Sequence, residues 1–252
     1  MAERITSRAN PLCTHFRKLA SSRSYRQEAG EFLCDSPKLL QEAHLWGAEI
    51  RTVLYTAGAK LPDLDAARVR VAEVSESVMR AVSPMETPQG VVFSCKVSPT
   101  ALPEKIGPGR YLVLDGIQDP GNVGTILRTA DAFDCGGIFL LPGCADLYNP
   151  KTLRAAMGVQ FRRALYPCTL EELTALLAAD IPLYVAALTE GAVDVRQADL
   201  TNAAIVIGSE GRGVSPQVLA ACQKALTIPM SSRCESLNAA VAAAVLLWEG
   251  WR

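Results

Sequence analysis

From residue 109 onward, short apolar segments alternate with amphipathic segments, and this alternation constrains the fold more than any other feature of the chain. The apolar segments have the length of buried strands, and the segments between them have apolar residues at helical spacing. Strands are predicted at 111–114, 137–141, 183–188, 203–208 and 225–228. Helices are predicted near 123–133, 150–157, 170–179, 216–221 and 236–251. This alternation is typical of an α/β domain with a parallel sheet covered on both faces, in which ligands bind beyond the carboxyl ends of the strands.

The segment before this region has a different organisation. The stretch 94–109 is rich in Pro, Gly, Ser and Lys and lacks sustained periodicity, so a linker is predicted at 98–108. Before it, strands are predicted near 31–34, 50–55, 69–74 and 90–95, and helices near 11–21, 37–46 and 76–81. We therefore expect a small α/β domain at 1–97 and a larger domain at 109–252.

Charge is unevenly distributed along a chain whose formal net charge is only −1. Residues 1–26 contain six Lys or Arg residues and one acid, Glu3. The basic residues of this segment are Arg4, Arg8, Arg17, Lys18, Arg23 and Arg26. Such a local excess attracts phosphate even on a nearly neutral protein, but a solvated, frayed N-terminus is an equally simple interpretation.

Composition also argues against several classes of protein. The eight cysteines include no C-x-x-C pair and only two histidines are present, so no metal site is predicted. The longest apolar run, 239–248, is about half the length that a membrane span needs, so no membrane partner is predicted. With no secretory signal at its start, the chain is predicted to be a reduced, cytoplasmic protein. The Arg- and Ser-rich start could also imitate an organelle transit peptide, an alternative disfavoured because this segment fits the first domain.

The first unusual loop follows the strand at 111–114 and has the sequence Leu-Asp-Gly-Ile-Gln-Asp-Pro-Gly-Asn at 114–122. Asn122 is predicted to cap the next helix. Asn122, Thr125 and Arg128 are spaced by three residues, which places them roughly on one helical face near the positive N-terminus. An amide and a cation there suit an anionic or alkoxide-bearing group. The simpler interpretation is a capped helix with a surface arginine.

The second loop follows the strand at 203–208 and has the sequence Gly-Ser-Glu-Gly-Arg-Gly at 208–213. Three glycines in six residues indicate close backbone approach or positive φ. Their spacing is neither the dinucleotide fingerprint G-x-G-x-x-G nor a P-loop. Glu210 is a carboxylate on exposed backbone, which favours a functional loop, although a tight structural turn is the alternative.

The third loop, 228–238, begins with Ile-Pro-Met and ends with Glu-Ser-Leu-Asn. Ser236 is predicted to cap the last helix. That helix has small residues at Ala239, Ala240, Ala242, Ala243 and Ala244. They allow close packing within the domain or against a second subunit, so the helix itself is interpreted as core or interface and its polar entry as the unusual part.

Together these loops resemble the three motifs of the SpoU/TrmH family of RNA 2′-O-methyltransferases. The pattern N-x-G-x-x-x-R appears as Asn122, Gly124 and Arg128. The pattern G-S-E-G-x-G lies at 208–213, and I-P-M followed by S-L-N lies at 228–238. Each motif alone is weakly specific, but all three occur in the family's order and spacing at the ends of predicted strands.

The first 97 residues resemble the family's small substrate-binding module, which has a ribosomal-protein-like (L30e-like) α/β fold. The matching segments are 7–11, 18–20, 32–33 and 87–90. The chain departs from the family where it has Asp35-Ser36 in place of an acid-glycine pair, and where Ala239-Ala240 replaces a common Val-Ser pair. The first departure bears on RNA specificity and the second on packing.

The resemblance implies a deep trefoil knot in the C-terminal domain, an exception to the rule that chains do not thread loops. It also implies S-adenosylmethionine as methyl donor and a homodimer through the knotted domain, with two subunits building each active site. Donor binding is expected from Leu188, Thr189, Gly208, Glu210, Gly211, Ile228, Met230, Ser236 and Leu237. RNA contacts are expected from Arg8, Arg17, Lys18, Arg23, Arg26 and Arg128.

By the same resemblance, the catalytic residues are Asn122, Arg128, Glu210 and Asn238. Methyl transfer is an in-line displacement, for which the protein mainly supplies orientation and electrostatics. Because an arginine with a pKa above about 12 is a poor proton acceptor, Arg128 is expected to stabilise the incipient alkoxide as a cation. The proton would leave through water or a neighbouring phosphate. Asn122 is expected to orient the ribose or Arg128, Glu210 to fix the arginine or a substrate group, and Asn238 to brace the loops.

Several alternatives remain at this point. Ribosomal RNA of the 23S type is the first choice of substrate, because dedicated tRNA enzymes of this type usually rely on basic terminal extensions; tRNA is the alternative. A non-catalytic RNA-binding protein of the same fold would require a broken motif, and none is broken. A nucleotide-dependent oxidoreductase is disfavoured because G-x-G-x-x-G is absent.

Overall fold

The computed structural model describes residues 3–98, 100–177 and 180–252. The chain divides into two compact units. The first unit consists of Met1–Pro99 with Asp146–Arg162, and the second of Thr100–Ala145 with Arg163–Arg252. The limits expected from the sequence assign 146–162 to the second domain, whereas its packing places it in the first unit.

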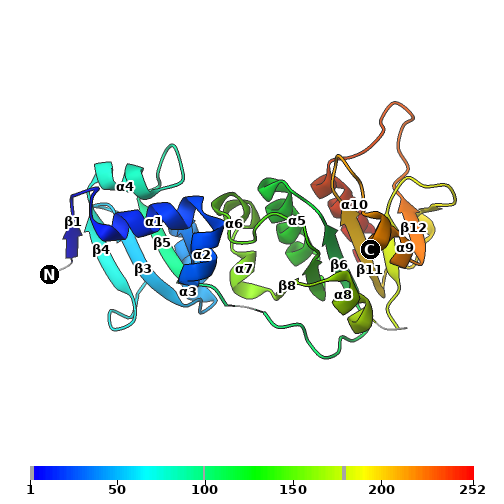
Figure 1. The fold of residues 1–252 in the computed structure, drawn as a ribbon, viewed down its shortest axis with the longest axis horizontal. Helices are drawn as coiled ribbons and strands as arrows, with labels where there is room; N and C mark the ends of the chain where they lie inside the picture. The colour runs from blue at the N-terminus through cyan, green and yellow to red at the C-terminus, as the bar shows by residue number, and fades with distance from the viewer. Residues whose placement is uncertain (1–2, 99, 178–179) are drawn as a thin grey trace. The chain divides into compact units, whose positions relative to one another are not determined.

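The first unit is built on a five-stranded mixed sheet (Figure 1). Its strands are β1 (Glu3–Ile5), β2 (Glu31–Asp35), β3 (Ile50–Tyr55), β4 (Arg70–Val74) and β5 (Val91–Lys96), in the order β1-β4-β3-β5-β2. β1, β4 and β3 are parallel, and β5 is antiparallel to both of its neighbours. Alternate residues of these strands face opposite sides, so both faces of the sheet are covered by apolar cores.

The helices of the first unit cover these two faces. α1 (Pro11–Ser21) and α4 (Glu76–Val82) contribute to one core, and α3 (Pro37–Leu45) and α6 (Pro150–Ala156) to the other. The shorter helices α2 (Arg23–Ala29) and α7 (Val159–Arg162) complete the unit. Leu153 of α6 is fully buried in the second core, so a segment far along the sequence is part of this unit's interior.

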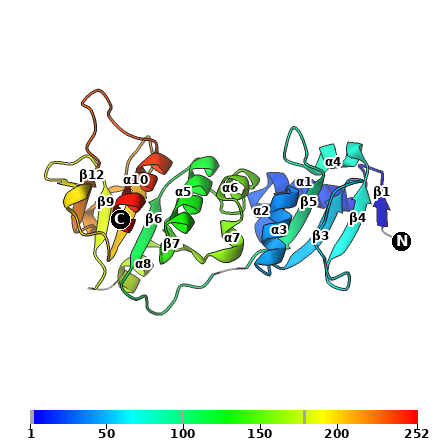
Figure 2. The ribbon, with the colours of Figure 1, turned by 180° about the vertical axis from the view of Figure 1, so that it is seen from behind.

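The second unit is built on a seven-stranded sheet in which the paired strands are parallel (Figure 2). Its strands are β6 (Arg110–Asp115), β7 (Gly137–Leu140), β8 (Leu165–Pro167), β9 (Leu183–Ala186), β10 (Val193–Asp194), β11 (Ala203–Gly208) and β12 (Lys224–Thr227). Their order is β10-β12-β9-β11-β6-β7-β8. The predicted α/β class with a parallel sheet is confirmed. None of the described helices is long and apolar enough to cross a membrane.

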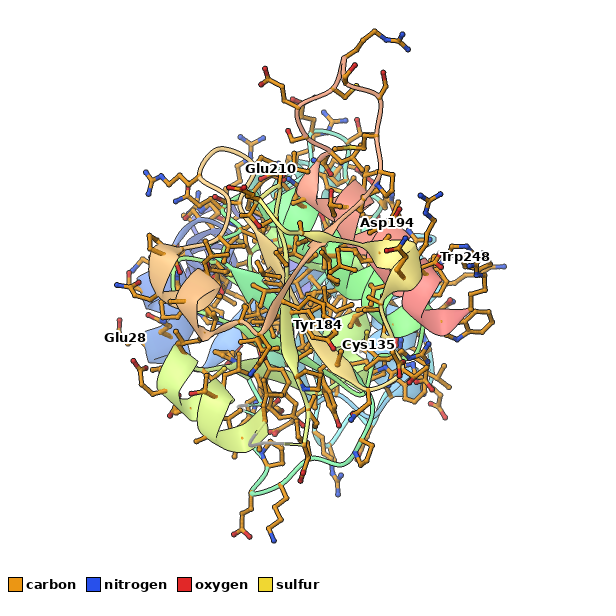
Figure 3. The ribbon with its side chains drawn as sticks, turned by 90° about the vertical axis from the view of Figure 1, so that its right-hand side faces the viewer. Glu28, Cys135, Tyr184, Asp194, Glu210 and Trp248 are labelled. Atoms are coloured by element: carbon orange, nitrogen blue, oxygen red, sulfur yellow. The ribbon has the colours of Figure 1, made fainter. Side chains whose placement is uncertain are left out.

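Helices cover both faces of this sheet, as the view in Figure 3 shows. α8 (Leu170–Leu177) and α9 (Pro216–Ala221) pack on a core that includes Tyr111, Val113 and Val206. α5 (Pro120–Ala132) and α10 (Ala239–Trp251) pack against each other, and α10 also contacts β11. A short 3₁₀ helix spans Val195–Gln197. Because the paired strands are parallel, the carboxyl ends of β6, β9, β11 and β12 point to the same side of the domain. The unusual loops begin there; we call this side the carboxyl edge of the sheet.

The structure corrects several predicted element limits. α5 begins at Pro120 with Asp119 as its N-cap, so the predicted cap Asn122 lies within the first turn; proline suits the first helical position because that N–H has no partner in the helix. α10 is capped by Asn238 rather than Ser236. β9 ends at Ala186, two residues before the predicted end, and residues 178–179 of the predicted helix 170–179 lie outside the described residues.

Elements that sequence periodicity did not predict are all short. They are β1, α2, α7, β8, β10 and the 3₁₀ helix. Segments of two to seven residues contain too few repeats for a period of 2.0 or 3.6 to be recognised. None of them changes the position of the candidate site.

Candidate functional site

One residue from each unusual loop meets at the carboxyl edge of the parallel sheet. The Asn122 amide nitrogen donates to Oε1 of Glu210. The Asn238 Nδ2 donates to Oδ1 of Asn122 at 3.2 Å and to Oε1 of Glu210 at 3.3 Å. We call this closed set of hydrogen bonds the amide–carboxylate triad. It joins residues 88 and 116 positions apart in sequence.

The two amides are oriented by the helices that carry them. Oδ1 of Asn238 accepts from the backbone N–H groups of Ala240 at 3.0 Å and Val241 at 3.3 Å, which turns its Nδ2 toward the triad. At α5, the cap is provided by Asp119, whose Oδ1 accepts from Asn122 N at 2.9 Å. The Asn122 side chain is therefore not needed as a cap and is available to the triad.

Glu210 is presented by a loop whose geometry requires two of its glycines. Ser209 and Gly213 exchange backbone hydrogen bonds of 3.0 and 2.9 Å, which closes a tight turn around 210–212. A Cβ at Gly208 would lie 2.4 Å from the backbone carbon of Gly213, and Gly213 has φ of +67°. A side chain at either position would disturb the turn. The site is thus preorganised by backbone, as the glycine pattern predicted.

Asp115 supports the region of the site from the end of β6, and sequence reasoning missed it. It ends β6, is buried, and its Oδ2 accepts from Ser215 N at 2.6 Å. This bond ties the end of β6 to the start of α9, beyond the glycine loop. An acidic residue directly after a run of buried strand residues was the signal that could have identified it.

A cavity of about 380 Å³ lies at the same edge of the second unit. The described residues that line it are Ala186, Ala187, Leu188, Thr189, Ile207, Gly208, Ser209, Glu210, Arg212, Gly213, Val214, Leu219, Leu226, Thr227, Ile228, Met230, Ser236, Leu237, Ala239 and Ala242. They come from the ends of β9, β11 and β12, from the loops that follow these strands, and from α9 and the start of α10. A mainly apolar cavity with a few polar groups at the carboxyl end of a parallel sheet is typical of a ligand site.

The predicted donor-binding residues can be compared with this lining. Leu188, Thr189, Gly208, Glu210, Ile228, Met230, Ser236 and Leu237 all line the cavity, and Gly211 does not. Arg212 and Leu219 line it and were not predicted. The signal for Arg212 was its place between two motif glycines, whereas Leu219 comes from the helix that follows the motif.

Arg128 lies apart from the triad. Its side chain is exposed on α5, six residues after Asn122, which corresponds to about 9 Å along the helix axis. No hydrogen bond or ion pair to this guanidinium occurs within residues 3–98, 100–177 and 180–252. Glu210 bonds the two asparagines in this structure. Of the two partners expected for Glu210, the arginine or a substrate group, Arg128 is not bonded to it among the described residues.

Two cysteines near Asp115 are not nucleophiles. Burial raises the pKa of the Cys144 thiol to about 11 and that of Cys222 to about 12, and the negative charge of Asp115 adds to both shifts. A thiol reacts as its thiolate, so both side chains remain inert near neutral pH. Among the described residues, no group of three or more His, Cys, Asp or Glu side chains could hold a metal ion.

The predicted RNA-contacting residues of the first unit separate into two groups. Arg8, Arg17, Lys18 and Arg23 are exposed. Arg26 is only 4% exposed. Its Nη2 and Nε donate to Asp146 at 2.6 and 3.0 Å, and its Nη1 donates to the Leu19 carbonyl at 2.6 Å. The RNA contact predicted for Arg26 is therefore wrong, because its donors are used within the fold.

Comparison with known proteins gives the site its context. The sequence model of the SpoU rRNA Methylase family matches residues 109–248, and that of the MRM3-like substrate binding domain matches residues 10–92. The chain belongs to the SpoU rRNA methylase family. The triad of this SpoU methylase therefore joins one residue from each family motif.

Relatives match the chain along almost its full length. The 23S rRNA (guanosine(2553)-2′-O)-methyltransferase RlmP of Bacillus subtilis is 32% identical, covering 98% of both chains. The 23S rRNA (uridine(2479)-2′-O)-methyltransferase of Streptomyces viridochromogenes is 30% identical, covering 100% of this chain and 92% of its own. The AdoMet-bound rRNA methyltransferase of Sinorhizobium meliloti matches the structure with a TM-score of 0.88 at 30% identity, covering 99% of this chain and 97% of its own.

The cavity suits the methyl donor S-adenosylmethionine that this family uses. Its volume lies within the range of about 300–1,000 Å³ found for small-molecule sites. Apolar side chains such as Leu188, Ile228 and Leu237 can cover a purine ring, and Thr189 and Ser236 offer hydroxyl groups. Glu210 supplies a negative charge for a cationic ligand. In volume and chemistry, the lining fits the donor.

Proposed function

We propose that this protein transfers a methyl group from S-adenosylmethionine to a ribose 2′-hydroxyl of ribosomal RNA. The proposed substrate is RNA of the 23S type. The observation that carries the proposal is the amide–carboxylate triad, because Glu210 belongs both to the triad and to the lining of the cavity. The names of the Bacillus and Streptomyces relatives, both 23S rRNA 2′-O-methyltransferases, support the choice of RNA.

In the proposed mechanism, S-adenosylmethionine supplies the methyl group together with its own leaving group. Arg128 stabilises the developing alkoxide of the ribose as a cation; its guanidinium is exposed and has no ion pair among the described residues, which supports this role. The proton leaves through water or an RNA phosphate, since arginine does not accept it. Asn122 orients the ribose, because Asp119 caps α5 in its place and the triad holds the Asn122 amide at the site.

Glu210 and Asn238 act on the loops rather than on Arg128. Glu210 accepts from both asparagines and keeps its negative charge at the edge of the cavity. Asn238 links the start of α10 to the motif loops through the same amide. We propose that these bonds hold three loops at fixed separations, which is the orientation that an in-line displacement requires.

Two architectural features complete the proposal for the second unit. The first is a trefoil knot, supported by the chain path after β12. In the sheet, β9 and β11 separate β12 from β6. After β12, loop 228–238 nevertheless brings the chain back to Asn238, which bonds Asn122 in the helix that follows β6. The second is a homodimer through this domain. Its support is an exposed apolar face of α10, where Val241, Trp248 and Trp251 are 48%, 51% and 52% exposed; Figure 3 labels Trp248 at the outer edge of this unit.

For the first unit we propose RNA binding by an L30e-like domain, with 1–97 as the substrate-binding domain, 98–108 as linker and 109–252 as the methyltransferase domain. The match of residues 10–92 to a substrate binding domain supports this assignment. The exposed basic residues Arg8, Arg17, Lys18 and Arg23 would contact phosphates. Given the bacterial rRNA enzymes among the relatives, we place the protein in the cytoplasm.

The test is transfer of tritiated methyl from S-adenosylmethionine to RNA. The substrates are free 23S rRNA, assembled large ribosomal subunits and tRNA, each from cells that lack the enzyme. We expect label in a ribosomal substrate, recovered as an alkali-resistant 2′-O-methyl nucleotide. Arg128→Ala is expected to lower the rate about 100-fold or more, the typical cost of losing one electrostatic stabiliser. Arg196→Ala is the matched control, since Arg196 is exposed and paired with Asp194 away from the cavity.

The outcomes separate the alternatives. Label confined to tRNA would replace the proposed substrate with the tRNA alternative. Donor binding without label in any fraction would favour a non-catalytic RNA-binding protein. Full activity of Arg128→Ala would remove Arg128 from the mechanism while leaving the triad in place.

A further inference from the structure

The cavity contains a pair of opposite charges that differ in their bonding. Among the described residues that line it, only Glu210 and Arg212 carry charge. Oε1 of Glu210 accepts from Asn122 and from Asn238. No hydrogen bond or ion pair to the Arg212 guanidinium occurs within the described part of the chain, although its backbone N–H donates to Ser209 Oγ at 3.3 Å.

We infer that Arg212 binds the carboxylate of the methyl donor's amino-acid part, an inference that rests on the proposed function. S-Adenosylmethionine combines an apolar purine, a sulfonium cation and an α-amino carboxylate. Among the described lining residues, Arg212 offers the one positive charge that can complement its carboxylate. A guanidinium is planar and matches a carboxylate with two parallel hydrogen bonds, so this pairing also fixes the orientation of the ligand.

The loop fixes the backbone that carries this side chain. Arg212 lies inside the turn closed by the two backbone hydrogen bonds between Ser209 and Gly213. Glu210 lies in the same turn and is held by the triad, so the backbone that carries Arg212 is fixed at both ends. A preorganised loop loses little conformational entropy when the ligand binds. One turn therefore presents a negative charge held by amides and a positive charge left for the ligand.

The test compares two ligands that differ only in the carboxylate, S-adenosylmethionine and decarboxylated S-adenosylmethionine. Their Kd values are measured by calorimetry on the full chain without RNA, so that no methyl transfer is needed. We expect the wild type to bind the decarboxylated ligand about tenfold more weakly, the value for one hydrogen-bonded charged pair in a partly exposed site. In Arg212→Met this ratio should fall close to one, and Arg212→Lys should restore part of it.

Arg233→Met is the matched control. Arg233 lies in the exposed part of loop 228–238 and is not among the lining residues, so the ratio should equal that of the wild type. An unchanged ratio in Arg212→Met would overturn the inference alone, and a raised KM for RNA in that variant would assign Arg212 to the RNA surface instead. Failure of the wild type to bind either ligand would overturn the proposed function and, with it, this inference.

Discussion

In the first unit, arginines are paired with buried or largely buried carboxylates, whereas the charges at the cavity of the second unit form no ion pair within the described part of the chain. Arg26 bonds Asp146 and Arg154 bonds Asp35 at 3.2 Å; we call these two pairs the arginine–carboxylate cluster. Arg26 and Asp35 have side chains only 5% and 3% exposed. Glu210, in contrast, is exposed and bonded by two neutral amides.

The difference separates structural charge from charge available to a ligand. A buried ion pair is neutral as a whole, and its donors are occupied, so it cannot bind RNA or a donor molecule. Amides satisfy the hydrogen bonds of a carboxylate without cancelling its charge. The second unit therefore keeps charges at its cavity that no ion pair cancels among the described residues, while the cluster of the first unit holds 146–162 against the rest of that unit.

The largest effect should come from opening the cluster. Arg26→Met removes every donor to Asp146 from this side chain and leaves the carboxylate, 16% exposed, without its cation. Breaking one partner of a buried pair typically costs about 3–5 kcal/mol, and we expect a decrease of this size in the free energy of unfolding. Urea denaturation of the full chain measures it.

The exposed pair of Arg68 with Asp65 in the same unit is the control for this prediction. Arg68→Met should leave the denaturation midpoint almost unchanged, because surface pairs contribute little. If both variants shifted the midpoint equally, the cluster would not be the structural element that the comparison assumes.

The next largest effect should come from the turn that presents Glu210. Gly208→Ala places a methyl group against the backbone of Gly213, so the turn must move. We expect a loss of about 1–3 kcal/mol in stability and about 100-fold in methyl transfer, since a displacement of about 1 Å has that cost in an oriented site. Thermal unfolding and the methyl-transfer rate measure the two quantities.

Gly211→Ala is the matched variant within the same turn. A Cβ at Gly211 would meet no atom within 4 Å, and no left-handed φ is required there. Its thermal midpoint should therefore stay near that of the wild type. A drop equal to that of Gly208→Ala would mean that the whole turn, rather than its close backbone approach, is sensitive to added volume.

The same contrast explains what sequence could predict. The residues of the triad were predicted, although their mutual hydrogen bonds were not: three unusual loops at strand ends drew attention to the segments, and the family resemblance then named Asn122, Glu210 and Asn238. Motif order then placed all three at one edge of a parallel sheet. Chain periodicity also predicted the long helices and the parallel sheet, because these elements contain enough repeats to be recognised.

The cluster could not be predicted, because its partners are far apart in sequence. Arg26 and Asp146 are separated by 120 positions, and Arg154 and Asp35 by 119. In the sequence, Arg26 is one of several basic residues near the N-terminus and carries no mark of burial. Its local charge predicted an RNA contact, and only tertiary packing shows that the side chain is used inside the fold.

The third effect concerns pH and the carboxylate of the cluster. Burial raises the pKa of Asp35 above its ordinary value of 3.8, and Arg154 offsets only part of this shift. A raised pKa in the folded state means that the fold binds the proton more tightly than the unfolded chain does. The contribution of Asp35 to stability is therefore complete below pH 3.8 and decreases as pH rises toward the folded pKa.

Asp35→Asn isolates this dependence. The free energy of unfolding of the wild type minus that of Asp35→Asn should decrease as pH rises above about 4 and then become constant. Urea denaturation at a series of pH values measures the difference, in which other carboxylates cancel. A difference that increases with pH would mean that the ion pair with Arg154 outweighs burial, and that the cluster is stabilised by ionised Asp35.

The smallest effect should come from Ser36, next to the cluster. Ser36 has φ of +106°, a conformation that favours glycine, and it caps α3 by accepting from Leu39 N at 3.2 Å. Ser36→Gly removes backbone strain worth about 1–3 kcal/mol, loses a few tenths through the cap and loses about 0.4–1 kcal/mol through the freer unfolded chain. We expect a net gain of about 0.5–1 kcal/mol and a raised Tm.

Ser75 is the matched control, because it caps α4 through the same type of bond to Val78 N but has φ of −68°. Ser75→Gly relieves no strain, so its Tm should fall. If both variants lowered Tm, the serine at Ser36 would be unstrained, and the contrast with Gly213, where glycine occupies the left-handed region, would not hold.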